Sequence, residues 1–193
     1  NPFVSIVDST TISHGNLDLK PAYRDNVQFT YNARVSIKKV TIYVSPQLFY
    51  EYKTGLIQNI ITLNSATNLF ESVPQNISNG YEYGASLSVN SQIGQVMFNS
   101  NFRYSYNYIN KYLDQIDETS LYSWNWNSFV MFPVVKDIQF MAVMNITGPT
   151  LNGQTEIKSS PFFLFGLNKQ FKNNSSLRLM AFNPFYKNFF TST

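Results

Sequence analysis

Hydrophobic and polar residues alternate along much of this chain with a period of two. From residue 27 to residue 37, every odd position holds Val, Phe, Tyr, Ala or Ile, and the even positions between them hold Gln, Thr, Asn, Arg and Ser. A β-strand points successive side chains to opposite faces, whereas a helical stripe would repeat every three or four residues. The pattern therefore predicts a strand with one apolar face and one polar face.

Similar alternation recurs along the chain and predicts an all-β protein, with residues 1–193 forming one β-barrel domain. We expect antiparallel strands at residues 26–36, 39–53, 80–92, 95–109, 121–133, 137–148, 160–171 and 175–185. Their lengths of roughly 10 to 15 residues exceed the five or six that are usual in globular proteins. A tilted strand needs roughly nine to eleven residues to cross a bilayer, so these strands are long enough to span a membrane.

The connections between these strands alternate between short and long. Short turns centre on residues 38, 94, 135 and 173, and longer connections fall near residues 53–79, 110–120 and 148–158. Outer-membrane barrels have this layout, with short turns in the periplasm and longer loops outside the cell. The pattern leaves open whether the apolar run at 56–63 extends a strand or forms a hairpin in a loop.

Tyr and Trp residues gather at the apolar positions next to the long connections. They are Tyr50, Tyr52, Tyr81, Tyr83, Tyr104, Tyr106, Tyr108, Tyr122, Trp124 and Trp126. Such side chains suit a membrane interface, because one end is apolar and the other forms hydrogen bonds. We expect them to form an outer aromatic belt. The alternative, a soluble sandwich with these rings in its core, would need many buried partners at one end.

Composition supports a wall with lipid on one side and water on the other. Aromatic residues make up 17% of the chain and charged residues only 13%, about half of the charged fraction of an ordinary soluble domain. Asn and Ser supply much of the polar remainder, as in the water-filled interior of a barrel. The net charge of +3 is dispersed, so no basic patch indicates nucleic-acid binding.

The polar face offers candidates for residues that face the lumen of a barrel. They are Arg34, Glu51, Glu82, Asn101, Arg103, Asn125 and Asn127. In a large barrel such residues would contact a plug or line a solute path, because lumen residues tune selectivity. Arg34 and Arg103 stand out as charges among neutral positions. The alternative for any one of them is generic hydration of the lumen.

Candidates for catalysis or metal binding are few. His14 is the only histidine, and it has no partners at chelating spacing. Asp114, Asp117 and Glu118 carry oxygen ligands of the kind that Ca²⁺ prefers, but their spacing is not that of an EF-hand, which favours a solvated loop. The chain has no cysteine and no nucleophile or nucleotide-binding motif. We expect no enzyme activity, no cofactor and no metal site.

Four segments together resemble a known family. Residues 16–23 read Asn-Leu-Asp-Leu-Lys-Pro-Ala-Tyr, similar to a signature Asn-Pro-x-Leu-x-Pro-Glu-Tyr, with Ala22 in place of the acid. Residues 75–84 are similar to a later stretch that ends in Tyr-Gly, residues 124–129 match a later strand, and residues 183–185 resemble a closing Asp-Pro-Phe. In this order they resemble the C-terminal barrel region of TonB-dependent outer-membrane receptors, particularly the outer membrane protein beta-barrel family widespread in Bacteroidetes.

The resemblance implies a transmembrane β-barrel in the bacterial outer membrane that takes up a solute. The eight strands would form part of a 22-stranded wall. Such receptors carry a plug domain and a TonB box, neither of which this sequence contains, so we expect a portion of a longer protein. The implied partners are membrane lipid and, in the full-length protein, its own plug and TonB. Two alternatives are a structural or interaction barrel that holds a surface lipoprotein or another envelope subunit, and a small closed eight-stranded barrel.

Overall fold

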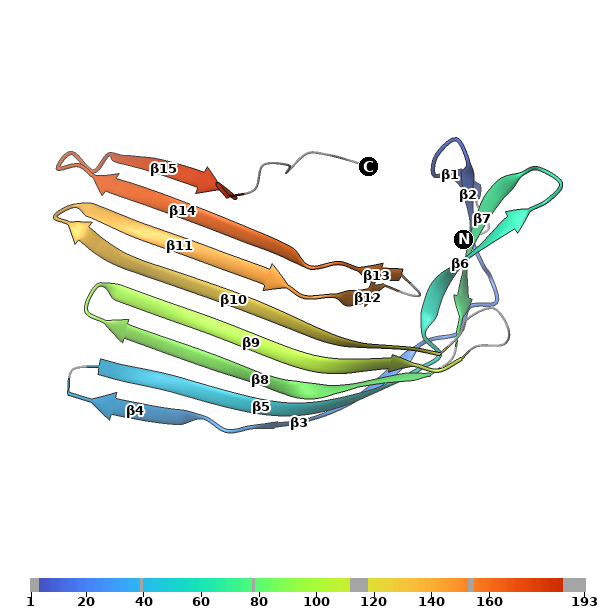
Figure 1. The fold of residues 1–193 in the computed structure, drawn as a ribbon, viewed down its shortest axis with the longest axis horizontal. Coiled ribbons are helices and arrows are strands. Elements are labelled where there is room, and N and C mark those ends of the chain that lie inside the picture. Colours follow the sequence, from blue (N-terminus) through green and yellow to red (C-terminus); the bar gives the residue numbers. More distant parts are fainter. Residues whose placement is uncertain (1–3, 39, 78, 112–117, 153–154, 186–193) are drawn as a thin grey trace.

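The computed structural model describes residues 4–38, 40–77, 79–111, 118–152 and 155–185, and these residues form strands joined by turns and loops (Figure 1). One large antiparallel sheet dominates, beside a four-stranded sheet and a two-stranded hairpin. The expectation of an all-β antiparallel architecture is confirmed. Within the described part of the chain, no helix is long and apolar enough to cross a membrane.

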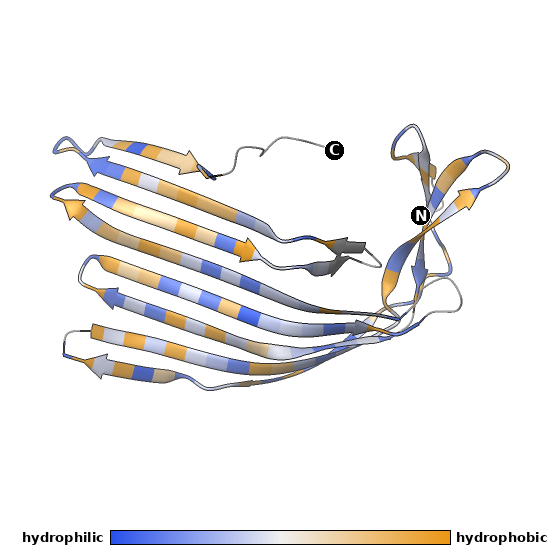
Figure 2. Ribbon diagram, viewed as in Figure 1, coloured by the Kyte–Doolittle hydropathy of each residue, from blue (hydrophilic) through white to orange (hydrophobic). Residues whose placement is uncertain are grey.

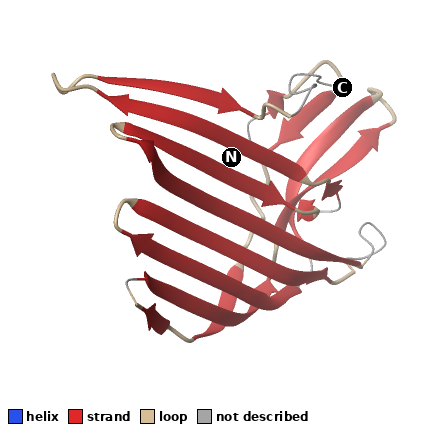
Figure 3. Ribbon diagram, turned by 60° about the vertical axis from the view of Figure 1, so that its left-hand side comes forward, coloured by secondary structure: helices blue, strands red, loops and turns tan. Residues whose placement is uncertain are grey.

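The large sheet runs in the order β15-β14-β11-β10-β9-β8-β5-β3, with β4 also beside β5. Its strands are β3 (Tyr23–Thr30), β4 (Ala33–Ile37), β5 (Val40–Thr54), β8 (Gly80–Ile93), β9 (Val96–Ile109), β10 (Thr119–Val135), β11 (Ile138–Thr147), β14 (Ser160–Gln170) and β15 (Ser176–Phe182). The central strands β5, β8, β9 and β10 contain 15, 14, 14 and 17 residues. Figure 3 shows the sheet from a second direction as a single layer of oblique strands. Among the described residues, the edge strands β15 and β3 do not pair with each other, so the sheet is open.

The strand expected at residues 26–36 is interrupted, which corrects the prediction. The break between β3 and β4 lies opposite Pro46 of β5. The Tyr31 N–H donates to the Pro46 carbonyl at 3.0 Å, but proline has no N–H with which to return the bond. The register is the same on both sides of the break, so the pairing with β5 is interrupted but not shifted.

The last strand ends earlier than expected, at Phe182 instead of residue 185. The next residue, Asn183, is buried and has a positive φ of 42°. Its N–H donates to the Phe163 carbonyl at 2.7 Å, and its side-chain oxygen accepts the Phe163 N–H at 2.5 Å. The Asn183 side chain thus replaces one bond of the ladder and turns the chain away from the sheet.

The connections next to the large sheet contain strands of their own. The apolar run at 56–63 forms β6 (Ile57–Asn64), which pairs with β7 (Leu69–Asn76), so this segment is a loop hairpin and not an extension of β5. β2 (Thr11–His14) lies parallel to β7 and antiparallel to β1 (Val4–Ile6). β12 (Thr150–Asn152) pairs with β13 (Thr155–Ile157). The alternating pattern predicted none of β1, β2, β7, β12 and β13.

Short turns lie at one end of the large sheet, opposite the β6–β7 hairpin (Figure 1). Each contains a residue with positive φ, namely Lys38, Gly94, Asp137 or Asn174. Gly94 is the first central residue of a two-residue loop between Ile93 and Val96, which pair with each other. A type II′ turn requires glycine at this position.

The large sheet leaves much of its apolar surface uncovered. The chain exposes 13803 Å², whereas a folded soluble protein of 22.2 kDa would expose about 9,400 Å². Val27 and Phe29 are 72% and 68% exposed. Figure 2 shows polar and apolar bands alternating along the strands. Since residues on one face of the sheet are apolar and uncovered, this face suits surroundings that are themselves apolar.

The β6–β7 hairpin is anchored to the large sheet at its base. Ile77 and Ile60 are buried together there, packed against Leu56 and Ile109. The Asn76 side chain joins the hairpin to the family-like segment at 16–23.

Three hydrogen bonds make this junction. The Asn76 amide oxygen accepts the Lys20 N–H at 2.6 Å, and its amide nitrogen donates to the carbonyls of Lys20 and Gly55, both at 2.9 Å. Lys20, near the end of the segment at 16–23, is therefore attached to the base of the hairpin.

Replacing Asn76 tests this anchor. Asn76→Ala removes all three bonds, and we expect it to weaken the attachment of residues 16–23 to the hairpin by about 1–3 kcal/mol. Hydrogen exchange should show the Lys20 amide losing protection. Asn76→Asp retains the acceptor and should preserve that protection while weakening the contacts with the two carbonyls. Unchanged exchange in Asn76→Ala would contradict the role assigned to this side chain.

Candidate functional site

The polar face of the large sheet collects the residues that the sequence singled out. Residues directly opposite one another in antiparallel strands lie on the same face. In this register Glu51 lies opposite Glu82, Arg103 opposite Asn125, and Asn101 opposite Asn127. Arg34 lies on the same face at the edge of the sheet, opposite Tyr43. The structure therefore brings all seven predicted polar residues to one face.

A chain of ion pairs crosses four strands on this face. Glu51 lies 3.4 Å from Arg24 and 3.1 Å from Lys53, and Glu82 lies 3.0 Å from Lys53 and 2.8 Å from Arg103. Glu51 and Glu82 would repel each other as directly opposed carboxylates, but Lys53 lies within ion-pair distance of both. The side chains of Glu51 and Glu82 are only 14% and 15% exposed. Sequence reasoning had not included Arg24 among its candidates, because pairing across strands is needed to find it.

An aromatic residue is buried beneath this charged chain. Phe49 is 6% exposed although it occupies a position on the polar face. Its ring lies beside Gly84 on the adjacent strand, and the guanidinium carbon of Arg103 lies 3.6 Å from the ring centroid. Glycine leaves space on the sheet that an aromatic ring of the adjacent strand can fill, and a cation over the ring is attracted to its π-face. The sequence analysis did not single out Phe49, although a Phe at a polar position of its strand could have pointed to it.

Amide and hydroxyl side chains continue the polar face toward the short turns. Gln47 donates to Gln28 at 2.9 Å and accepts from Ser86 at 3.1 Å, and Asn125 donates to Thr147 at 3.0 Å. Two hollows of ≈ 330 and ≈ 320 Å³ border this surface, and Arg103 lines both. The result is a hydrogen-bonding surface that is largely neutral next to the ion chain.

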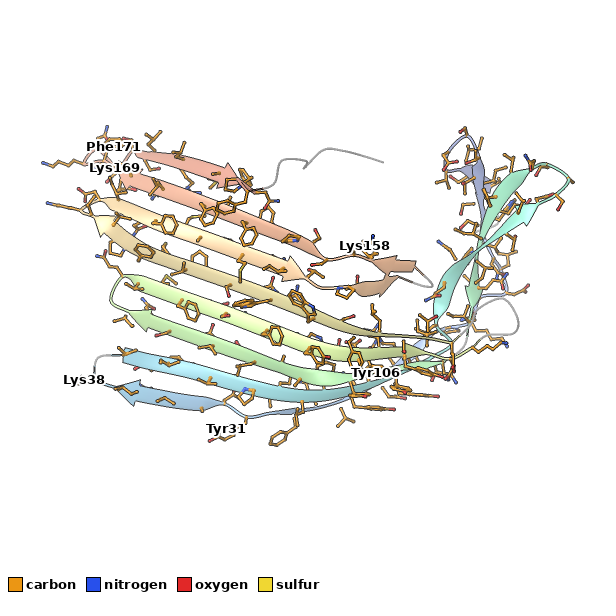
Figure 4. The ribbon with its side chains drawn as sticks, in the orientation of Figure 1. Tyr31, Lys38, Tyr106, Lys158, Lys169 and Phe171 are labelled. Atoms are coloured by element: carbon orange, nitrogen blue, oxygen red, sulfur yellow. The ribbon has the colours of Figure 1, made fainter. Side chains whose placement is uncertain are left out.

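The opposite face carries the expected aromatic residues. Ring contacts with centroids 4.9–6.4 Å apart join Tyr50, Tyr81, Tyr83, Tyr104, Tyr106, Tyr108 and Tyr122. The indole N–H of Trp126 donates to the Ser100 hydroxyl at 3.0 Å, and the Trp124 ring lies against Gly148. Tyr106 lies far from the turn end that Lys38 and Lys169 mark (Figure 4). The cluster therefore lies toward the end of the sheet with the long connections.

Other candidate residues form no comparable site. The Nε2 atom of His14 lies 4.0 Å from a Glu71 carboxylate oxygen. Among the described residues, no group of three or more His, Cys, Asp and Glu could hold a metal ion. Asp114 and Asp117 lie outside the described residues, and Glu118 accepts a hydrogen bond from the Tyr108 hydroxyl at 2.9 Å.

Adding a methyl group at Gly84 tests the packing beneath the ion chain. In Gly84→Ala the new carbon would overlap the Tyr104 carbonyl and lie 2.8 Å from Ser105 Cα, and these backbone atoms cannot move without separating β8 from β9. We expect a loss of about 1–3 kcal/mol in the free energy of unfolding. Denaturant titration in detergent measures it. Ser86→Ala, on the same face of the same strand, is the control; it removes only the hydrogen bond to Gln47 and should cost less than Gly84→Ala. Equal stability of the two variants would contradict the packing described.

Comparison with known protein families gives one result that agrees with this two-faced sheet. Residues 1–193 match the model of the Outer membrane protein beta-barrel family. A search among curated proteins finds no match. Because the match covers the whole sequence, and because the sheet has one apolar and one polar face, the chain belongs to the Outer membrane protein beta-barrel family, whose place is the bacterial outer membrane.

Proposed function

We propose that this chain forms part of the wall of a solute transporter, the barrel portion of a TonB-dependent receptor. The observation that carries the proposal is the polar face that runs across β3, β5, β8, β9 and β10, opposite an exposed apolar face. A wall with lipid outside and water inside requires these two faces.

The open edges of the sheet favour a large barrel. Among the described residues, β15 forms one edge, β3 and β4 form the other, and these edges do not pair with each other. Unpaired backbone groups cost several kcal/mol each in hydrocarbon, so spanning sheets are closed. Additional strands at both edges would satisfy them, as in a 22-stranded wall. A small barrel closed by these strands alone has less support.

The polar face fits a path for a polar solute. Its ion chain contains three cations and two anions that pair with one another. Such mutual pairing leaves little unpaired charge to attract ions of one sign, while the Asn, Gln and Ser side chains offer both donors and acceptors. Movement of a solute would additionally require a plug and energy delivered through TonB.

A second candidate function is an interaction barrel that holds a surface lipoprotein or another envelope subunit. The sheet formed by β1, β2, β7 and β6 favours it, because Ile61, Leu63 and Phe70 lie on one face and are 63%, 52% and 45% exposed. Apolar residues gathered on an exposed surface commonly mark protein contacts. A transporter can use the same surface, so the two functions are compatible.

The intact mass of the native protein tests the proposal of a larger wall. We expect mass spectrometry of the protein extracted from outer membranes to give a mass well above 22.2 kDa, with peptides from a plug domain. A native mass of 22.2 kDa would contradict both the larger barrel and the TonB-dependent receptor. A larger mass without a plug would favour the interaction barrel.

Surface labelling tests the direction of the loops. This chain has no cysteine, so a single substitution adds the one thiol of this region, and the unsubstituted protein gives the background signal. An impermeant maleimide should label Ala66→Cys, at the exposed tip of the β6–β7 hairpin, on intact cells. It should label Gln95→Cys, in an exposed short turn, only after the cells are opened. The reverse result would place the long connections in the periplasm.

A further inference from the structure

Methionine residues form a row on the polar side of the sheet, near the short turns. Met97 lies directly opposite Met131, Met131 opposite Met141, Met141 opposite Gly166, and Gly166 opposite Met180. This methionine row contains four of the five methionines of the chain. Met144 lies on the other face, opposite Ser128 and Phe163.

Gly166 brings two members of the methionine row together. A carbon added at Gly166 would lie 2.8 Å from Met141 Cγ and 3.3 Å from its sulfur. The Met141 side chain therefore lies over Gly166 and fills the space that a side chain would occupy there. Met180 follows directly on the other side of Gly166, so no side chain separates the two residues. Met131 flanks Met141 from the opposite strand.

The methionine row is partly accessible from solvent. Met97 and Met180 are 39% and 37% exposed, and Met131 and Met141 are partly exposed. A hollow of ≈ 530 Å³ lies between the methionine row and the short turns, and Gln139, Asn168 and other residues line it. The Asn168 side-chain oxygen is buried without a hydrogen-bond partner. An ion could therefore reach the thioethers from water without opening a packed core.

The chemistry of these side chains selects a particular ligand. Thioethers are soft, neutral ligands that favour Cu(I) over hard cations such as Ca²⁺ or Mg²⁺. Directly opposed residues such as Met131 and Met141 have Cβ atoms about 4.5–5.5 Å apart. Met141 and Met180 lie two strand spacings apart, about 10 Å, and two flexible methionine side chains that extend over Gly166 can bridge this separation around one ion. The chain has no cysteine, so thioethers are its only sulfur ligands. Packing alone does not require Met, because Leu fills a similar volume.

We infer that the methionine row binds one soft monovalent d¹⁰ cation, Cu(I) or Ag(I). Met141 and Met180 form the centre of the site across Gly166, Met131 supplies a third thioether, and Met97 lies farthest from the centre. The site is independent of the proposed transport function, because it needs only the strand register of β9, β10, β11, β14 and β15.

Titration with Ag(I), which is stable in air, tests the site. The full-length protein is purified in detergent, labelled with ¹³C at the methionine methyl groups and titrated in chloride-free buffer. We expect the methyl signals of Met131, Met141 and Met180 to shift and to saturate at one ion per chain, with a smaller shift at Met97. The Met144 signal should stay in place, which makes it an internal control.

Substitutions separate metal binding from packing. Met141→Leu and Met180→Leu keep the apolar volume and should greatly reduce the affinity for Ag(I), while Met144→Leu should leave it unchanged. Gly166→Ala retains every ligand but displaces Met141, and we expect about tenfold weaker binding, as is typical when a residue that orients a ligand is changed. The circular dichroism of each variant checks the fold.

Three results would overturn the inference. The first is the absence of any methyl shift in the wild-type protein. The second is an equal shift at Met144. The third is undiminished Ag(I) affinity in the Met141→Leu/Met180→Leu double variant, which would show that the methionine row is only an apolar surface.

Discussion

The structure depends on one constraint: a single layer of strands must face two different solvents while its backbone groups stay paired. Within the sheet, each strand hydrogen-bonds to its neighbours, so only the two edges have backbone N–H and C=O groups that still need hydrogen-bond partners. The side chains then divide by position, with Val27 and Phe29 uncovered on one face and charged or amide groups on the other. A soluble sheet would bury its apolar face in a core. Here few apolar side chains are buried among the described residues, and the surrounding lipid takes the place of that core.

Pairing between strands gives the polar face its order. Glu51 and Glu82 would destabilise the sheet as directly opposed anions, and Lys53 between them offsets this repulsion. Arg103 links two features, because it pairs with Glu82 and covers the Phe49 ring. Gly84 makes the arrangement possible by leaving space for that ring. The same principle recurs near the turns, where Gly166 leaves space for Met141. In both places a glycine in a strand lets a large neighbouring side chain lie flat on the sheet.

The sequence predicts the regular parts of this structure better than its exceptions. Period-two alternation locates β8 and β9, because each of their residues faces either lipid-like or polar surroundings. It also places the seven polar candidates on one face, since face depends only on odd or even position once the register is known.

The break between β3 and β4 could not be predicted from residues 26–36 themselves, because its cause is Pro46 on β5. Phe49 and Arg24 were missed for the same reason, since their roles arise from Gly84 and Glu51 across strand boundaries. The hairpin of β6 and β7 has an apolar run without clear alternation, which is why pattern alone left its structure open.

Spin labels placed singly along β9, at each position from residue 98 to residue 105, measure the central claim of a two-faced wall most directly. In reconstituted bilayers, a wall between lipid and water predicts that collisions with oxygen, which dissolves in lipid, are most frequent at even positions such as Phe102. Collisions with a polar nickel chelate should instead be most frequent at odd positions such as Asn101, with both quantities varying every two residues and out of phase. Profiles that rise and fall together, or that show no period of two, would contradict the assignment of lipid and water to the two faces.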